Sequence, residues 1–153
     1  MLAWRIAKKQ YALERTGIGT RTYGGRWNAP GVATIYAGMS PEISAMEKLV
    51  HAGDILPVDL VLVRLNLPDD ETLYYRCSIA ELPSGWDDLP GSTVAVEFGN
   101  AFINAGAQLG MIVPSVVMPE ASNIILNPNH REFAKVEMTV VRPFQFDSRL
   151  RGD

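Results

Sequence analysis

The stretch YGGRWNAPGVATIYA, residues 23–37, joins a glycine-rich loop to a short apolar run. Gly24 and Gly25 permit unusual backbone angles or let a ligand approach the main chain closely. Arg26 follows them and presents a planar fork of donors suited to phosphate or carboxylate. The Pro-Gly pair in the middle predicts a turn, and residues 32–36 then predict a buried strand that ends near Tyr36. The loop therefore carries the Arg26 cation, and the strand carries the Tyr36 ring. A hairpin with a surface arginine and a core tyrosine fits the local chemistry equally well.

The composition is that of a globular protein. Of 153 residues, 47% are hydrophobic and 20% charged, enough for a single domain over 1–153. We expect its core over about 4–141 and a polar tail over 144–153 that frays. The net charge of −3 argues against a direct nucleic-acid binder. Cys77 is the one cysteine, which suits a reducing cytoplasm, and no apolar run is long enough for a membrane span.

A helix is predicted to begin after Ser40 and to end near Ala52. Ser40 can cap it, and a proline at its first position and a glutamate in its first turn favour the start. Glu47 falls at the edge of its apolar stripe, where a carboxylate costs free energy unless it is paired or faces a cleft. Lys48 is expected on the opposite, solvent-facing side. His51 lies at the border of the stripe and is interpreted as a packing or supporting residue.

The rest of the chain predicts further strands and a second long helix. Strands are expected at 4–6, 57–67, 74–75, 111–118, 123–126 and 136–141, and the helix at 93–109, where Gly99 indicates close packing. The Gly-x-Gly at 17–19 is interpreted as a plain loop. Pro114 removes a ladder donor, so its strand is expected to be an edge strand or bulged. Ser115 then either faces a cleft or satisfies its own backbone.

The sequence has no cluster with zinc spacing, no phosphate-binding Walker loop and no Gly-x-Ser-x-Gly elbow. What remains is a scattered set: Arg26, Tyr36, Glu47 and Ser115. An arginine for a diphosphate, a ring for a flat heterocycle and an acid near a sugar carbon would suit attack on a nucleotide glycosidic bond. A fixed carboxylate stabilises the positive charge that develops on ribose as the base leaves. This interpretation requires that the side chains converge in space.

At this point the chain resembles a known family. The blocks Gly-Gly-Arg-Trp-Asn-Ala-Pro-Gly (24–31), Ile-Tyr-Ala (35–37) and Ser-Ala-Met-Glu-Lys-Leu-Val-His (44–51) look like the RES domain. Val-Pro-Ser (113–115) and Asn-Pro-Asn-His (127–130) match its later motifs, so the likeness extends from about 4 to 141. The family is named for its Arg, Glu and Ser, which map to Arg26, Glu47 and Ser115.

The resemblance implies a bacterial toxin with an α/β (α+β) fold like that of mono-ADP-ribosyltransferases, a split mixed sheet with flanking helices. It implies NAD as the substrate and no metal. Carried over by position, Arg26 would bind NAD, Tyr36 would stack on or orient the nicotinamide ribose, Glu47 would stabilise the oxocarbenium, and Ser115 would hold the substrate. Further substrate-binding candidates are Trp27 and Asn28, and supporting candidates are His51, Asn123 and His130.

The resemblance also implies a partner, an Xre-like antitoxin that covers the active cleft. A cytoplasmic location is expected, and a homodimer stays open. The activity expected first is cleavage of the nicotinamide bond, with water or phosphate as the acceptor. Transfer of ADP-ribose to a protein is the alternative within the same chemistry. A more remote alternative is a non-catalytic binding module in which Arg26 and Tyr36 serve a protein interface.

Overall fold

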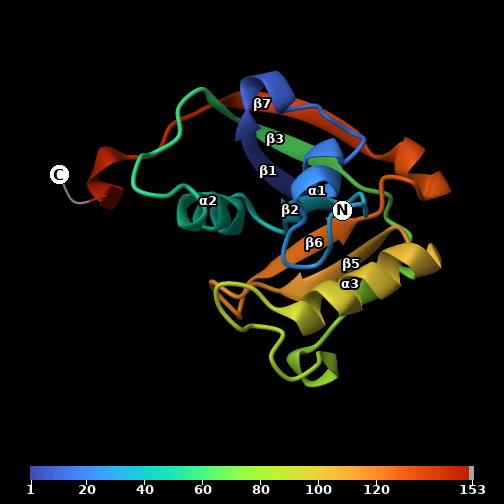
Figure 1. Cartoon of the computed structure of the whole chain (residues 1–153). Coiled ribbons are helices and arrows are strands. Elements are labelled where there is room, and N and C mark those ends of the chain that lie inside the picture. The colour runs from blue at the N-terminus through green and yellow to red at the C-terminus, as the bar shows by residue number, and fades with distance from the viewer. Residues whose placement is uncertain (152–153) are drawn as a thin grey trace.

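Seven strands form one mixed sheet in the order β4-β5-β6-β2-β1-β3-β7 in the computed structural model, which describes residues 1–151 (Figure 1). The strands are β1 (Leu2–Lys8), β2 (Ile35–Gly38), β3 (Leu60–Asn66), β4 (Tyr74–Arg76), β5 (Gly110–Pro114), β6 (Ser122–Leu126) and β7 (Glu137–Phe144). The helices are α1 (Ile18–Tyr23), α2 (Pro41–Val50) and α3 (Thr93–Ala105), with short 3-10 turns η1 (Lys9–Tyr11), η2 (Glu71–Leu73), η3 (Ile79–Glu81), η4 (Arg131–Lys135) and η5 (Ser148–Arg151). The predicted α+β class is confirmed.

The sheet is nearly split between β1 and β2. These two strands pair where Trp4 lies opposite Gly38, whereas β1 and β3 pair along the whole of β1. One half of the sheet is β4-β5-β6-β2 and the other is β1-β3-β7, and the two halves diverge on either side of this junction (Figure 1). Only β4 and β5 run parallel among the strand pairs of residues 1–151. The junction leaves a gap along β1 that β2 does not fill.

Strand residues alternate between two faces, as the pleat of a strand requires. Val61, Val63 and Leu65 of β3 enter the main core on one face, together with Ile124 and Leu126 of β6. On the opposite face, alternate residues of β5 and β6 pack under α3, and alternate residues of β1 and β3 pack beside α2. This face therefore has two separate apolar clusters, with the β1–β2 junction between them.

Helix α2 begins as the sequence predicts. The Ser40 side chain accepts a hydrogen bond from the Ile43 amide, and a proline takes the first helical position. The helix ends at Val50 with His51 as its C-cap, two residues earlier than expected. A side chain at Gly38 would come within 2.4 Å of the Ser44 hydroxyl, so glycine is required where α2 crosses β2. Close packing fixes α2 against the junction.

Helix α3 is shorter than predicted and passes very close to the glycine-rich loop. It ends at Ala105 because Gly106 adopts the left-handed conformation of a helix C-cap. A Cβ atom at Gly99 would lie 1.8 Å from the carbonyl oxygen of Trp27. The close packing predicted at Gly99 is therefore confirmed, and its partner is the backbone of the Gly-Gly-Arg-Trp-Asn loop.

Two local predictions are wrong for tertiary reasons. The Gly-x-Gly at 17–19 does not form a plain loop, because Ile18 begins α1 and Gly17 precedes it with a positive φ of 71°. Gly17 lies against Thr34, whose amide and carbonyl groups bond the Thr20 hydroxyl. The strand predicted at 32–36 begins only at Ile35. Contacts with residue 34, rather than local propensity, hold this helix in place.

The strand that contains Pro114 is not an edge strand. β5 lies between β4 and β6, and its last register pair with β4 joins Ile112 to Arg76. Pro114 is the last residue of β5 and lies beyond the end of β4, so no ladder donor is missing on that side. Ser115 then begins the turn rather than continuing a strand to 118.

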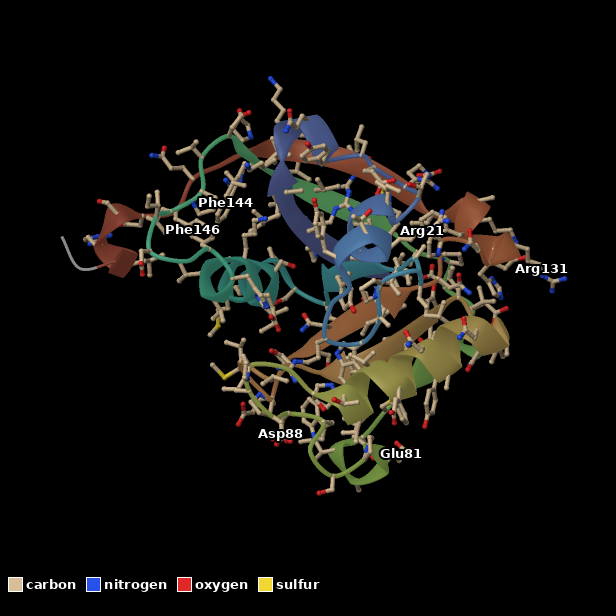
Figure 2. All side chains as sticks on the ribbon, in the orientation of Figure 1. Arg21, Glu81, Asp88, Arg131, Phe144 and Phe146 are labelled. Atoms are coloured by element: carbon tan, nitrogen blue, oxygen red, sulfur yellow. The ribbon has the colours of Figure 1, made fainter. Side chains whose placement is uncertain are left out.

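The C-terminal segment is packed where fraying was expected. β7 continues to Phe144, and Phe146 is buried in the cluster beside α2. The rings of Phe144 and Phe146 meet edge to face, 5.0 Å apart, between β7 and α2 (Figure 2). The chain therefore stays in the fold at least to Phe146.

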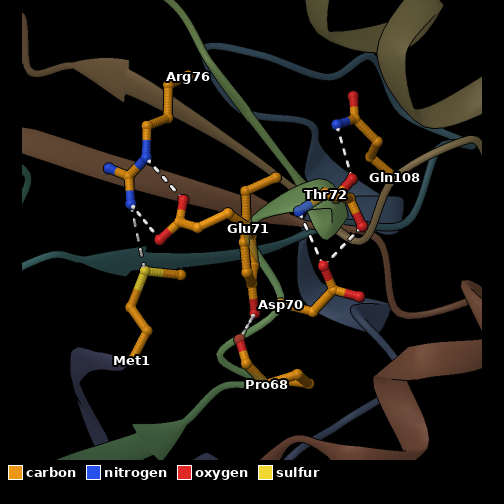
Figure 3. Close-up of polar contacts among 8 residues, drawn as sticks. Met1, Pro68, Asp70, Glu71, Thr72, Arg76 and Gln108 are labelled. Carbon is orange, nitrogen blue, oxygen red and sulfur yellow. Dashed lines mark hydrogen bonds and ion pairs between the residues drawn. The ribbon is translucent and has the colours of Figure 1, made fainter.

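The chain crosses from one half-sheet to the far edge of the other between β3 and β4. Polar contacts hold this crossing: the Thr72 amide and hydroxyl bond Asp70, and Gln108 donates to the Thr72 carbonyl (Figure 3). Arg76 of β4 pairs with Glu71 at 3.3 Å.

Within residues 1–151, no helix has the length and apolar character needed to cross a bilayer.

Candidate active site

A cavity of about 670 Å³ opens at the β1–β2 junction, between the two apolar clusters of one sheet face. Its walls come mainly from β1, the glycine-rich loop, β2, helix α2 and the turn after β5, with single residues from α1 and β6. A loop around residues 89–90 closes one side. The volume is in the range of pockets that enclose a small organic ligand. Of the four predicted catalytic residues, Arg26, Tyr36 and Glu47 line the cavity.

Glu47 is held on the cavity wall by two side-chain donors. Its Oε1 accepts a hydrogen bond of 2.8 Å from the Ser115 hydroxyl and one of 2.7 Å from the Asn123 amide. The side chain is 26% exposed, so the carboxylate still reaches the cavity. Helix α2, β6 and the turn after β5 thus meet at one carboxylate. Two donors on one oxygen fix the orientation of the carboxylate and leave Oε2 toward His51, 4.0 Å from its Nδ1.

Ser115 lies behind Glu47 rather than beside a ligand. Its side chain is completely buried, and its hydroxyl accepts hydrogen bonds from the amides of Val117 and Met118 while donating to Glu47. The hydroxyl satisfies its own turn, as one interpretation of the sequence expected, and it does not face the cleft; it reaches the site only through Glu47. Its place fits a positioning residue better than the substrate-holding role that the resemblance implies.

Tyr36 and Asn28 form one buried network with the glycine-rich loop. The Tyr36 hydroxyl donates to Asn28 Oδ1 at 2.7 Å and accepts from the Trp27 amide at 3.0 Å. The Asn28 amide donates to the carbonyls of Thr20 and Val32. Burial raises the pKa of Tyr36 to about 12, so the phenol stays protonated at neutral pH. Gly25 leaves room for this network, since a Cβ there would lie 2.8 Å from the Tyr36 oxygen.

Arg26 ties the glycine-rich loop to the loop that closes the cavity. Its Nη1 donates to the carbonyl oxygens of Trp86 and Asp88, at 3.0 Å each. Leu89 and Pro90, which follow directly, line the cavity, and Figure 2 places Asp88 in this loop below the sheet. The guanidinium therefore holds the two loops together, and Arg26 also lines the cavity.

Trp27 and Trp86 join the loops from beneath. Their rings stack with centroids 6.0 Å apart, and Phe98 of α3 meets Trp27 edge to face at 6.2 Å. Trp27 is 3% exposed and Asn28 is 1% exposed. Trp27 reaches the cavity wall, but its main contacts are with α3 and the 86–90 loop. Both residues, predicted as substrate-binding, chiefly shape the loop that carries Arg26.

The two histidines lie in different places. His51 is exposed at the rim of the cavity, where its Nδ1 lies 2.7 Å from the Glu47 carbonyl oxygen, and it is not packed in the core. His130 caps η4 by accepting a hydrogen bond from the Glu132 amide.

Asn123, a weaker candidate in the sequence, directly contacts Glu47. No group of three or more metal-ligating side chains occurs among the described residues.

The sequence and the fold can now be compared with known proteins. A family model described as the RES domain matches residues 2–147. The chain belongs to the RES domain family.

Relatives of this RES chain are similar over nearly their whole length. It is 33% identical to the "Prs ADP-ribosylating toxin" of Sphingobium sp. (strain YBL2), over 96% of this chain and 94% of that protein. It is 34% identical to "Toxin Res" of Photorhabdus laumondii, over 98% of this chain and 97% of that protein. The fold is similar to that in the crystal structure of the M. tuberculosis MbcT–MbcA toxin–antitoxin complex, with a TM-score of 0.70, 15% identity, and coverage of 93% of this chain and 84% of that one.

Two cationic residues of this RES cavity were not predicted. Lys48, which the sequence assigned to the solvent face of its helix, is half-buried and lines the cavity. Val50, which the sequence assigned to the apolar stripe, is instead 60% exposed at the same wall. Arg5 of β1 lines it as well. The helical pattern failed here because α2 packs on β1 through Ala45 and Leu49 rather than through Val50. No local signal marked Arg5, because the gap beside β1 exists only once β2 has turned away.

Proposed function

We propose that this RES chain is the toxin of a toxin–antitoxin pair and that it cleaves the nicotinamide glycosidic bond of NAD. The observation that carries the proposal is the Glu47 carboxylate, fixed by Ser115 and Asn123 on the wall of a cavity that Tyr36 and Arg26 also line. Side chains from distant parts of the sequence thus converge on one pocket. The volume of about 670 Å³ is adequate for a ligand of this size.

The chemistry follows from where charge develops. The bond between the ribose C1′ and the nicotinamide nitrogen breaks, and its electron pair leaves with nicotinamide, which becomes neutral. Positive charge then spreads over C1′ and the ring oxygen of the ribose. A fixed carboxylate stabilises this charge more in the transition state than in the ground state. A nucleophile, with loss of its proton, then bonds to C1′.

Tyr36 and Arg26 would place the substrate against Glu47. The protonated Tyr36 ring is held rigid by Trp27 and Asn28, so it offers a fixed surface to the nicotinamide ribose. Arg26, at the lip of the cavity, supplies positive charge for the diphosphate and keeps the 86–90 loop in place. Water or phosphate is the acceptor that we propose first.

Transfer of ADP-ribose to a protein is the second candidate. It is favoured by the name of one relative, an ADP-ribosylating toxin. The first step and its carboxylate are the same, and the acceptor alone differs. With this alternative, labelled ADP-ribose would accumulate on a protein rather than as a free product.

The partner we propose is an Xre-like antitoxin seated over the cavity. The similar fold in the MbcT–MbcA complex supports a protein partner. Exposed apolar side chains at the cavity, Val50 and Leu89, would give such a partner a surface to bury. Addition of the protein encoded beside this chain should therefore suppress its activity.

The test is release of nicotinamide from NAD by the purified chain. We expect release by the wild type, and we expect Glu47→Gln to lower it on the order of 100- to 1,000-fold, because the shape is kept while the charge is lost. The matched control is Glu97→Gln, an exposed glutamate of α3, which should keep full activity. Thermal unfolding of each variant checks that the fold is intact.

Absence of nicotinamide release by the wild type, with or without candidate acceptors, would contradict the proposal. Host growth inhibition that survives both Arg26→Gln and Glu47→Gln would instead favour a non-catalytic binding module. Equal loss of activity in Glu47→Gln and Glu97→Gln would show that the assigned carboxylate has no special role.

A further inference from the structure

One end of the cavity has an accumulation of positive charge. Arg5 of β1 and Lys48 of α2 line it. Lys8, the exposed last residue of β1, lies outside this lining and acts on the Lys48 ammonium through its charge. The three residues come from the strand and the helix that meet beside the β1–β2 junction. This group is distinct from Arg26, which belongs to the glycine-rich loop and bonds the 86–90 loop.

Lys48 is half-buried among cations. Burial lowers its pKa, and the positive charges of Lys8 and Arg5 lower it further. The neighbouring acid on the helix, Glu47, directs its Oε1 to Ser115 and Asn123. An ammonium held partly out of water beside two like charges is unfavourable unless an anion comes to it.

Arg5 contributes positive charge to the cavity rather than a free donor. Its Nη2 donates to the carbonyl oxygens of Ala12 and Glu14, which hold the guanidinium in place. Its Nε bonds no acceptor among residues 1–151, and it has almost no accessible surface, so a ligand in the cavity does not reach it. Burial lowers the pKa of Arg5, and the charge of the Glu14 carboxylate, which is bonded to Thr16 and Gly17, opposes this shift.

We propose that one end of the cavity is a phosphate-binding site, in which Lys48 contacts the anion while Arg5 and Lys8 add positive charge around it. A bound phosphate would relieve the repulsion among the three cations. This deepens the proposed function, because the diphosphate of NAD and a free phosphate acceptor both carry this chemistry.

The position of Lys48 gives the site a functional consequence. It follows Glu47 directly on α2, so an anion bound to Lys48 lies beside the carboxylate that is proposed to act on the ribose. With Arg26 occupied in part by the 86–90 loop, the cavity gains a second place to hold the charged part of a dinucleotide. Lys48 would therefore be a binding residue in its own right rather than a solvent-facing lysine.

Calorimetric titration of the whole chain tests this without depending on turnover. Inorganic pyrophosphate, inorganic phosphate and ADP-ribose are the three probes. We expect pyrophosphate to bind the wild type and Lys48→Gln to weaken this binding about tenfold, whereas Lys48→Arg keeps most of it because the charge remains. The control is Arg131→Gln, which removes one positive charge from an exposed residue at the far side of the molecule (Figure 2).

If Lys48→Gln fails to fold, Lys8→Gln replaces it, because Lys8 is exposed and should weaken pyrophosphate binding by a smaller factor. Weaker binding of ADP-ribose as well would identify the dinucleotide diphosphate as the ligand. Weaker binding of inorganic phosphate with unchanged ADP-ribose binding would identify a free phosphate.

Two outcomes overturn the inference: no pyrophosphate binding by the wild type, or equal effects of the Lys48 or Lys8 variant and the Arg131 variant. Failure of the proposed function would look different, because nicotinamide release would then be absent while the pyrophosphate titration still distinguished these variants.

Discussion

At the scale of single residues, the site depends on how one carboxylate is held. Glu47 Oε1 receives two donors that differ in burial, since Ser115 is fully buried and Asn123 is half-buried at the cavity. Ser115 also accepts from two backbone amides. Removal of each donor should therefore affect stability and activity in different proportions.

We expect Ser115→Ala to lower the free energy of unfolding by about 1–3 kcal/mol, because two partly buried amides lose their acceptor. Asn123→Ala should cost less stability, since its position stays open to water. It should lower nicotinamide release by about the same factor as Ser115→Ala, because in both variants the Glu47 carboxylate loses a donor. Urea unfolding and an activity assay of both variants make the comparison. Equal losses of stability would show that the buried turn at Ser115 contributes little.

At the scale of secondary-structure elements, the contact between α3 and the glycine-rich loop decides where Arg26 and Trp27 lie. The helix passes the Trp27 carbonyl at Gly99, and Trp27 in turn stacks on Trp86. A helix, a loop and the wall of the cavity are thus fixed by one close approach. Glycine in a helix interior normally costs about 1 kcal/mol relative to alanine, so its presence here has a packing reason.

Gly99→Ala is expected to destabilise the chain by about 3 kcal/mol, because the added Cβ would lie 1.8 Å from a backbone oxygen and the helix must move. Gly19→Ala in α1 is the matched control: nothing lies within 4 Å of its Cβ position, and alanine favours a helix. Measured against the wild type, the midpoint of thermal unfolding should fall in Gly99→Ala and rise in Gly19→Ala. A similar fall in both would contradict the assigned packing.

At the scale of the whole molecule, the gap between the half-sheets is kept open by packing on either side. Helix α2 is held against β1 and β3 by a cluster that Phe146 completes from the C-terminal segment. Phe144 and Phe146 meet edge to face beside this helix (Figure 2). The end of the chain therefore supports the helix that carries Glu47 and Lys48.

Phe146→Ala should lower the free energy of unfolding by about 3–5 kcal/mol, the usual cost of removing a buried aromatic ring. It should also weaken activity in the fraction that stays folded, because α2 loses support. Leu150→Ala, at an exposed leucine of η5, is the control and should change little. Denaturant unfolding measures both, and an effect of Phe146→Ala no larger than that of Leu150→Ala would refute the role given to the segment.

Local sequence determined much of this protein. The sequence predicted the alternation in β3, the Ser40 cap of α2 and the close packing at the glycine of α3. It could do so because strand, cap and close-packing signals depend on neighbouring residues. The family motifs also placed Arg26, Tyr36 and Glu47, which line one cavity.

Only the tertiary structure decided the rest. It put Ser115 behind Glu47, turned Lys48 into the cavity, made α1 from an apparent loop and packed Phe146 where fraying was expected. Each of these depends on a contact between segments far apart in the chain, such as Ser115 with Glu47. Periodicity reports which side of an element is apolar, but the neighbour that covers that side is set by the path of the whole chain around the divided sheet.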